Sequence, residues 1–122
     1  MKEKAGGLGR EGEKRAAESL KSRGYRIIAR NFRRKFGELD LVAEDGEELV
    51  FVEVKTRSSI SFAHPLESIT PAKKKRLILA AAAFIQENGL EDKNCRFDAV
   101  AVYPGGEGDW RVEVVKNAFE AG

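Results

Sequence analysis

The sequence has very little cysteine and histidine, the side chains that form disulfides and bind zinc. Its 122 residues include one cysteine, Cys95, and one histidine, His64. A single cysteine excludes an intramolecular disulfide and any cysteine-rich zinc site, which suits a reducing cytoplasm. We expect Cys95 to be a buried, inert thiol. We expect His64 to shape the loop before Pro65 or to face solvent rather than to act as a general base.

Long hydrophobic runs are also missing. The longest, LILAAAAFI at residues 77–85, is far too short to span a bilayer. The first residues, MKEKAGGLGREGEK, contain no apolar core of the kind found in signal peptides. These features predict a cytoplasmic protein that makes no membrane contact.

Neither sign of charge is in large excess. The formal net charge is +2, from 22 basic and 20 acidic residues, so nucleic-acid binding cannot be inferred from net charge. A hydrophobic content of 42% is enough for a modest core. Because the chain has no repeat and no internal linker, we expect one domain over residues 1–122, with a flexible start at 1–7 and a C-terminal tail at 117–122.

Residue patterns predict two helices and five strands. The first helix should end before Gly24, and the second should begin at Thr70 and Pro71 and close at Gly89. Runs rich in β-branched and aromatic residues predict strands. In chain order the expected elements are a helix at about 9–23, strands at 24–32, 38–44 and 48–57, a loop at 58–69, a helix at 71–88, and strands at 95–103 and 110–115. The order αβββαββ predicts an α/β fold.

Charged residues interrupt two of the apolar strands. Side chains alternate along a strand, so Glu53 and Lys55 should share a face while the valines at 50, 52 and 54 share the other. A hairpin that turns on Asp45 and Gly46 would pair Asp40 with Phe51. Asp40 would then lie diagonally from Glu53, about 7–8 Å away at the backbone.

A third carboxylate should point inward from the first helix. Ala16, Ala17 and Leu20 fall at helical spacing on one apolar face. Extending that face by one turn toward the N-terminus reaches Glu13. Glu13 is therefore predicted to face the sheet.

Two half-buried carboxylates repel each other and lose hydration unless a cation or proton compensates. Oxygen ligands favour magnesium or manganese over zinc. Lys55, held beside such an ion, could orient water or stabilise charge at phosphorus, as phosphodiester hydrolysis requires. The alternative is an internal salt bridge between Glu53 and Lys55. The Glu-x-Lys spacing recurs at Glu91 and Lys93 in a polar loop, so burial rather than spacing distinguishes the strand pair.

Three segments carry a resemblance to a known family: GREGEKRAAESL, GYRIIARN and GELDLVAEDGEELVFVEVKTR. Together they resemble the YraN-like family of uncharacterised bacterial proteins, which is similar to archaeal Holliday junction resolvases and the PD-(D/E)xK nuclease superfamily. The resemblance implies a restriction-endonuclease-like fold, a central mixed sheet flanked by helices. It also implies that Asp40 and Glu53 are metal-binding acids, Lys55 the catalytic lysine and Glu13 the helix-borne acid of resolvase-like members.

Basic residues supply candidate contacts to nucleic acid. Taken singly, each cluster is equally well explained as a solvated surface. However, lysines in a first helical turn are badly placed for the helix dipole, which favours an anionic partner. Together with the resemblance this predicts DNA bound through its phosphates. The candidate residues are Arg30, Arg33, Arg34, Lys35, Arg57, Lys73, Lys74 and Lys75.

The leading hypothesis is a magnesium- or manganese-dependent endonuclease acting on branched or structured DNA. If four-way junctions are the target, two symmetric cuts favour a homodimer. One alternative is a non-catalytic nucleic-acid-binding module that retains the fold. Another is an interaction protein whose basic clusters dock an acidic protein. Asp98, which interrupts another strand, is expected to pair with Arg96.

Overall fold

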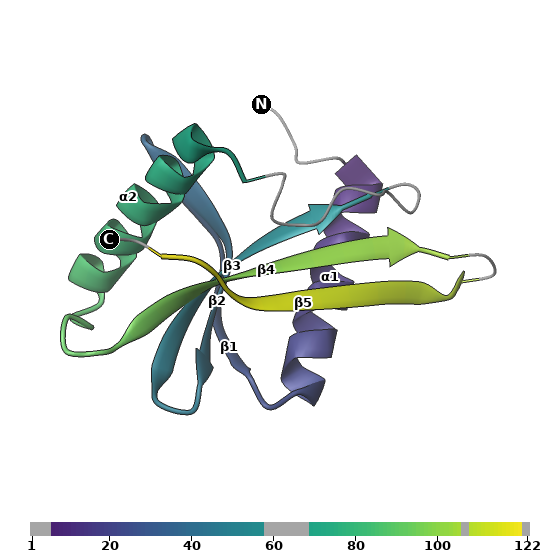
Figure 1. Cartoon of the computed structure of the whole chain (residues 1–122), viewed down its shortest axis with the longest axis horizontal. Helices are drawn as coiled ribbons and strands as arrows, with labels where there is room; N and C mark the ends of the chain where they lie inside the picture. The colour runs from purple at the N-terminus through teal and green to yellow at the C-terminus, as the bar shows by residue number, and fades with distance from the viewer. Residues whose placement is uncertain (1–5, 58–68, 106–107, 121–122) are drawn as a thin grey trace.

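The computed structural model describes residues 6–57, 69–105 and 108–120, so the expected role of His64 lies outside the described residues. The described residues form two helices and five strands, which are labelled in Figure 1. Their bounds are α1 Gly6–Ser22, β1 Arg26–Arg34, β2 Gly37–Asp45, β3 Glu48–Thr56, α2 Pro71–Glu87, β4 Cys95–Pro104 and β5 Trp110–Phe119. The predicted order αβββαββ is confirmed.

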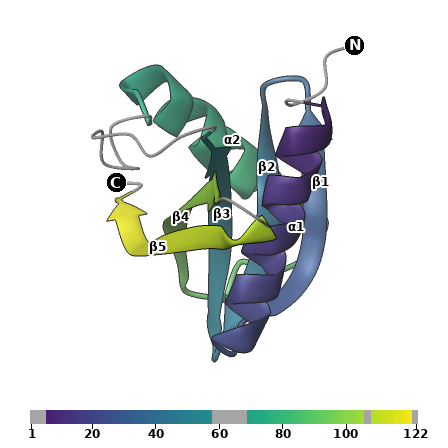
Figure 2. The same ribbon diagram turned by 90° about the vertical axis from the view of Figure 1, so that its right-hand side faces the viewer.

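The strands form one mixed sheet in the order β1-β2-β3-β4-β5. Neighbouring strands are antiparallel except β3 and β4, which run parallel and are joined through α2. The two helices lie on opposite sides of the sheet (Figure 2). This confirms the expected central mixed sheet flanked by helices. Neither helix within the described ranges is long and apolar enough to cross a membrane.

Several element ends differ from the sequence prediction: β1 covers residues 26–34 rather than 24–32, and the first and last elements are longer than expected. Helix α1 begins at Gly6, so residues 6 and 7 belong to a helix rather than to a flexible start. Strand β5 continues to Phe119, so residues 117–119 are strand rather than tail. Phe119 explains the extension, because its ring stacks on that of Phe97 with 4.6 Å between centroids and is buried in the core.

Each helix covers its own hydrophobic core. On one face, Leu49 and Phe51 of β3 pack beneath Leu77 and Phe84 of α2. On the other face, the valines at 50, 52 and 54 pack beneath α1, whose inward residues are Ala16, Ala17 and Leu20. The predicted alternation of β3 is therefore confirmed. The side chains of Glu53 and Lys55 follow Leu49 and Phe51 toward the α2 face.

The turn between β2 and β3 differs from the predicted one. The strands pair Asp45 with Glu48 and Ala43 with Val50, so the central turn residues are Gly46 and Glu47 rather than Asp45 and Gly46. Gly46 has a φ of 63°. A glycine at the first central position is typical of a type II′ hairpin, which glycine adopts without steric cost. The predicted pairing of Asp40 with Phe51 is consequently wrong by two residues.

The side-chain alternation of β2 breaks at Asp40. Leu39 and Val42 both belong to the core under α2, while Leu41 lies in the core under α1. Strict alternation would place Leu39 with Leu41. The pairing of β2 with β3 also ends here, at Leu41 opposite Val52. Such irregularities re-aim a side chain, and this one directs a carboxylate into the protein.

A buried ionic network holds the sheet together away from α2. Asp98, whose side chain has no solvent exposure, accepts a hydrogen bond from Arg96 Nε at 3.0 Å, which confirms the expected pair. Asp98 also accepts from the hydroxyl of Tyr25 at 2.8 Å and from the backbone N–H of Asn117 at 3.0 Å. Burial, and then the bond to Asp98, raise the pKa of Tyr25 to about 12. The phenol therefore stays protonated and continues to donate.

Cys95 lies at the start of β4 and is exposed, so its predicted burial is wrong. It pairs with Leu49 at the edge where β4 begins, directly after the polar turn that contains Asn94. A residue at the end of a strand is open to solvent on the side of the turn, even when the strand itself is buried.

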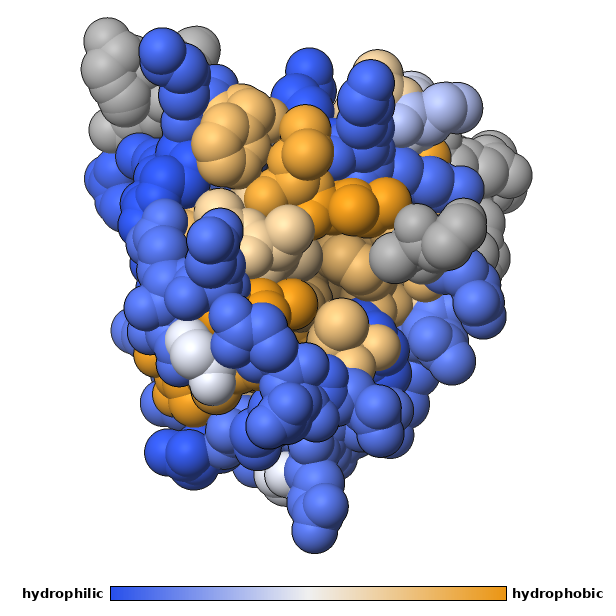
Figure 3. Space-filling model, turned by 90° about the vertical axis from the view of Figure 1, so that its left-hand side faces the viewer, coloured by the Kyte–Doolittle hydropathy of each residue, from blue (hydrophilic) through white to orange (hydrophobic). Residues whose placement is uncertain are grey.

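The side of the molecule on which α2 lies carries exposed hydrophobic residues. Figure 3 shows them gathered across the middle of this face, framed by hydrophilic residues. In the part of the chain that the structure describes, Phe36 and Leu79 are the large hydrophobic side chains exposed to solvent, each at 43%. Four apolar residues of α2, by contrast, are buried: Leu77, Ala80, Ala81 and Phe84.

Candidate active site

Three of the four predicted catalytic residues line one cavity. It has a volume of about 210 Å³ and lies between the N-terminal half of α1, the end of β3 and the first turn of α2. Glu13 reaches it from α1, and Glu53 and Lys55 reach it from β3. The inward direction predicted for Glu13 is therefore consistent with its position. Gly9, Val54, Thr56 and Lys73 complete the lining.

Glu53 is the most buried charge at this cavity. Its side chain is 8% exposed and forms an ion pair with Lys73, with 2.6 Å between Oε2 and Nζ. A buried carboxylate needs a nearby positive charge, because desolvation disfavours its ionised form. Here a lysine of α2 provides that charge. The sequence suggested Lys55 as an internal partner and did not predict Lys73 in this role.

The cap of α2 fixes where Lys73 stands. Thr70 precedes the helix, and its side-chain oxygen accepts a hydrogen bond from the backbone N–H of Lys73 at 3.2 Å. Pro71 occupies the first helical turn, as predicted. Lys73 is thus the third residue of the helix, on the side that faces β3. The expected capping residues therefore position a cation over Glu53.

Asp40 lies beside β3 but does not line the cavity. It is 2% exposed, and its Oδ2 accepts a hydrogen bond from the backbone N–H of Val54 at 2.7 Å. Val54 is the residue that follows Glu53, beyond the point where pairing with β2 ends. The Val54 N–H lies beyond the last paired residues of β2 and β3, and the carboxylate provides it with a hydrogen-bond acceptor. Asp40 is next to the Glu53 segment, although not through the predicted diagonal register.

The donors at this site suit a hard divalent cation. Asp40 and Glu53 offer carboxylate oxygens, and magnesium is commonly bound by only one or two protein carboxylates plus water. The ammonium of Lys73 already places one positive charge at Glu53. Among residues 6–57, 69–105 and 108–120, no group of three or more His, Cys, Asp or Glu side chains forms a metal site. Carboxylate oxygens such as those of Asp40 and Glu53 are the type of donor that magnesium prefers, whereas zinc sites are typically built from histidine and cysteine.

Close packing of α1 on β3 sets the position of Glu13. Gly12 is buried, and a Cβ built on it would lie 1.9 Å from the side-chain oxygen of Thr56. Only glycine lets the helix approach this closely without displacing Thr56. Because Gly12 directly precedes Glu13 and Thr56 directly follows Lys55, this contact fixes the distance between two walls of the cavity.

Gly12→Ala is expected to destabilise the fold, although alanine is the better helix former by about 1 kcal/mol. The added methyl group overpacks the contact with Thr56, which costs roughly 1–3 kcal/mol. Urea denaturation should show a lower midpoint, and the double variant Gly12→Ala, Thr56→Ala should recover part of it. A single variant more stable than the wild type would show that the approach is not tight.

The predicted basic residues on β1 are partly engaged within the protein. Arg33 pairs with Glu38 at 3.0 Å, and Arg34 pairs with Glu87 of α2. The guanidinium of Arg34 also lies 4.0 Å from the ring centroid of Phe32. Both arginines are therefore ion-paired with carboxylates of the protein. The exposed Arg30 and Lys35 have no ion pair with any other described residue.

The three lysines of α2 point to different places. Lys73 contacts Glu53, Lys74 lies 5.5 Å from the ring centroid of Phe119, and Lys75 is exposed. Residues three or four apart share a helix face, whereas consecutive residues diverge. The run therefore does not form one continuous basic patch. Arg57 is half-buried, and its Nε has no hydrogen-bond partner within the described chain.

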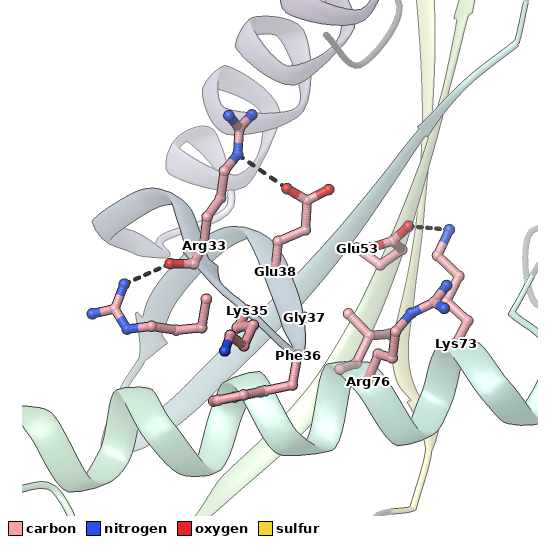
Figure 4. Close-up of a pocket in the computed structure, with 10 residues that line it drawn as sticks. Arg33, Lys35, Phe36, Gly37, Glu38, Glu53, Lys73 and Arg76 are labelled. Carbon is pink, nitrogen blue, oxygen red and sulfur yellow. Dashed lines mark hydrogen bonds and ion pairs between the residues drawn. The ribbon is translucent and has the colours of Figure 1, made fainter. Parts of the chain in front are cut away.

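A larger cleft of about 490 Å³ adjoins the cavity and shares Glu53 and Lys73 with it. Figure 4 shows its walls: Arg33, Lys35, Phe36 and Glu38 come from the β1–β2 hairpin, and Arg76 and Lys73 rise from α2. The sequence prediction missed Phe36, for which a position in the hairpin turn was the available signal. Arg76 directly follows the lysine run of α2.

Two solved structures resemble this fold. One is Hjc from Archaeoglobus fulgidus, a Holliday junction resolvase, with 20% identity, a TM-score of 0.46, and coverage of 86% of this chain and 75% of that one. The other is SfsA from Pyrococcus furiosus in complex with Ca²⁺, with 16% identity, a TM-score of 0.42, and coverage of 89% of this chain and 62% of that one.

Sequence relatives extend over nearly the whole chain. A UPF0102 protein of Symbiobacterium thermophilum is 49% identical over 114 residues, covering 93% of this chain and 97% of that protein. One from Moorella thermoacetica is 48% identical over 112 residues, covering 91% and 93%. The model of the uncharacterised protein family UPF0102 matches residues 12–102. The chain therefore belongs to UPF0102, which confirms its resemblance to the YraN-like proteins.

Proposed function

We propose that this protein is a metal-dependent endonuclease that hydrolyses phosphodiester bonds in branched or structured DNA. The observation that carries the proposal is the cavity in which Glu13, Glu53 and Lys55 meet. Carboxylates and a lysine at one cavity are the groups that phosphodiester hydrolysis needs. They come from a helix and from the end of a central strand, so a rigid scaffold holds them.

Asp40 and Glu53 would hold a magnesium or manganese ion. When bound, such an ion polarises a phosphate oxygen and lowers the pKa of water. The Glu53 segment would be kept in place by the bond from the Val54 N–H to Asp40. Lys55, on the same wall as Glu53, would orient the attacking water or bind a phosphate oxygen. Glu13, which lines the same cavity from α1, would accept a proton.

The basic side chains around the cleft would bind the DNA backbone. Lys35 and Arg76 line it, and Lys73 stands where the cleft meets the cavity. Phosphate contacts of this kind orient DNA without reading its sequence, and they weaken as salt rises. Because two symmetric cuts of a four-way junction need two sites, we include a homodimer in the proposal for that substrate.

A non-catalytic nucleic-acid-binding module is the second candidate. The ion pair between Glu53 and Lys73 favours it, because the lysine compensates the buried carboxylate without any metal. In such a module the acids would be structural, and the cleft would still bind phosphates. The two candidates differ in metal binding and in cleavage.

The function is tested with purified full-length protein and labelled four-way junction, flap and linear duplex DNA. We expect calorimetry to detect magnesium or manganese binding, and cleavage of the junction or flap to require the metal. Calcium and a chelator serve as controls for metal-dependent chemistry. Salt-dependent binding with no cleavage of any substrate under either metal would favour the binding module, and the absence of DNA binding would reject both.

A further inference from the structure

An aromatic side chain stands exposed at the tip of the β1–β2 hairpin. Strand pairing ends with Arg34 opposite Gly37, so Lys35 and Phe36 form the two-residue connection. Phe36 is 43% exposed although the chain has a core in which other phenylalanines are buried. A hairpin turn usually carries polar residues or glycine. The local backbone does not explain a phenylalanine there.

The hairpin tip is held against α2. A Cβ built on Gly37 would lie 2.4 Å from the carbonyl oxygen of Arg76, so the two backbones touch. Such an approach is possible only at glycine. On the other side of the tip, Arg34 forms an ion pair with Glu87 of α2. Two contacts therefore pin the turn, and the ring of Phe36 is presented at a defined place.

The cleft beside Phe36 is built for an anion. Its lining includes five basic side chains and two acidic ones. Arg33 and Arg34 are paired with carboxylates, but Lys35 and Arg76 form no ion pair within the described part of the chain. Both are exposed. Two available cations and an exposed ring thus border a cleft whose inner end is Glu53 (Figure 4).

A ring beside cations is the combination that binds nucleic acid with unpaired bases. Basic side chains follow the backbone while an aromatic ring stacks on a base, whatever its sequence. A continuous duplex offers phosphates but keeps the faces of its bases stacked on one another. An exposed Phe36 therefore adds affinity only where a base is free of its partner.

We propose that Phe36 stacks on an unpaired nucleobase of DNA whose backbone runs along Lys35 and Arg76 toward Glu53. This inference rests on the proposed function for the identity of the ligand, and it narrows the substrate to DNA with unpaired bases beside the site. A flap or an opened junction meets that requirement, whereas a continuous duplex does not.

A single tryptophan at the hairpin tip reports stacking directly. The chain contains one tryptophan, Trp110, which packs on the α1 side of the sheet and does not line the cleft. The double variant F36W, W110F therefore has its only indole at the cleft. In chelator, where no metal-dependent cleavage occurs, we expect single-stranded and flap DNA to quench its fluorescence and blunt duplex of the same sequence to leave it nearly unchanged.

Affinity provides the second readout. F36A should weaken binding of flap DNA roughly five- to 150-fold, the range expected for loss of one base–aromatic stack, and change duplex binding little. L79A is the matched control, because Leu79 is equally exposed but lies outside the cleft lining. F36L, which keeps an apolar side chain without a ring, should behave like F36A.

The outcomes separate this inference from the nuclease. Quenching and the F36A loss without cleavage in any metal support the stack and reject the endonuclease. Metal-dependent cleavage with no quenching, and with F36A equal to the wild type, rejects the stack and leaves the endonuclease. If F36A and L79A weaken flap binding equally, the effect is not stacking and the inference is wrong.

Discussion

Glu53→Gln is expected to abolish magnesium-dependent cleavage, with a loss of more than about a hundredfold in rate, the size reported for removing one key electrostatic group from an active site. The amide has nearly the same volume as the carboxylate, so packing at β3 should change little. It carries no charge, however, and therefore binds a divalent cation poorly. Calorimetry of the variant should show that magnesium binding is lost together with cleavage.

Glu38→Gln is the matched control for charge. Glu38 lines the adjoining cleft and is ion-paired with Arg33, but its side chain is 47% exposed where that of Glu53 is 8% exposed. An exposed pair contributes about 0–1 kcal/mol and holds no metal in the proposed site. We expect the control to cleave within about twofold of the wild-type rate. Equal rates for Glu53→Gln and the wild type would remove Glu53 from the proposed site.

Asp40→Asn tests the other half of the proposed pair. Its amide oxygen can still accept the hydrogen bond from the backbone N–H of Val54, so the end of β3 should keep its place. Only the charge is removed. If Asp40 binds the metal, the variant should lose magnesium binding while unfolding at a urea concentration near that of the wild type. If Asp40 only satisfies Val54, metal binding should survive.

A variant of Lys73 tests whether Glu53 is a structural ion-pair partner rather than a metal ligand. Lys73→Met removes the ammonium that lies 2.6 Å from the carboxylate. In a metal site this cation competes with the ion, so its loss should not weaken magnesium binding. If the acids are structural, the same change leaves a buried charge uncompensated and should mainly lower stability. A metal site therefore predicts that Lys73→Met leaves magnesium binding intact, whereas a structural ion pair predicts that it lowers the stability of the fold.

Much of the fold follows from local patterns. Alternation in β3 placed Glu53 and Lys55 on one face, and helical spacing in α1 directed Glu13 toward the sheet, because each pattern depends only on residues close in sequence. The cap at Thr70 and Pro71 was predictable for the same reason. These three features identify residues that α1, β3 and α2 contribute to the candidate site.

The parts that were not predicted depend on contacts between distant segments. The shift of the β2–β3 turn to Gly46 and Glu47 moved the register by two residues, and the broken alternation at Asp40 has no marker in the local pattern. The pairing of Glu53 with Lys73 joins a strand to a helix, between residues that are 20 positions apart in the sequence. Sequence spacing carries no information on such a pair, because its geometry exists only after the chain has folded.

The largest effect on stability is expected at the other end of the sheet, where Arg96→Met should cost about 3–5 kcal/mol by leaving a buried charge uncompensated. The guanidinium bonds Asp98 at 3.0 Å, Asp45 at 2.8 Å and the hydroxyl of Tyr25 at 2.9 Å, and its side chain is only 9% exposed. Such a loss is a large fraction of the 5–15 kcal/mol that typically holds a domain folded.

Two further variants test whether the cost of Arg96→Met comes from the uncompensated carboxylate of Asp98 or simply from the loss of an arginine. Arg26→Met breaks an ion pair with Glu44 whose arginine is 74% exposed, so urea denaturation should show a change of about 0–1 kcal/mol. The double variant Arg96→Met, Asp98→Asn removes the stranded charge together with its partner and should recover part of the stability lost by Arg96→Met. If the double variant instead loses the sum of both single effects, Asp98 and Arg96 act independently. The network would then owe its stability to packing rather than to compensation of the carboxylate.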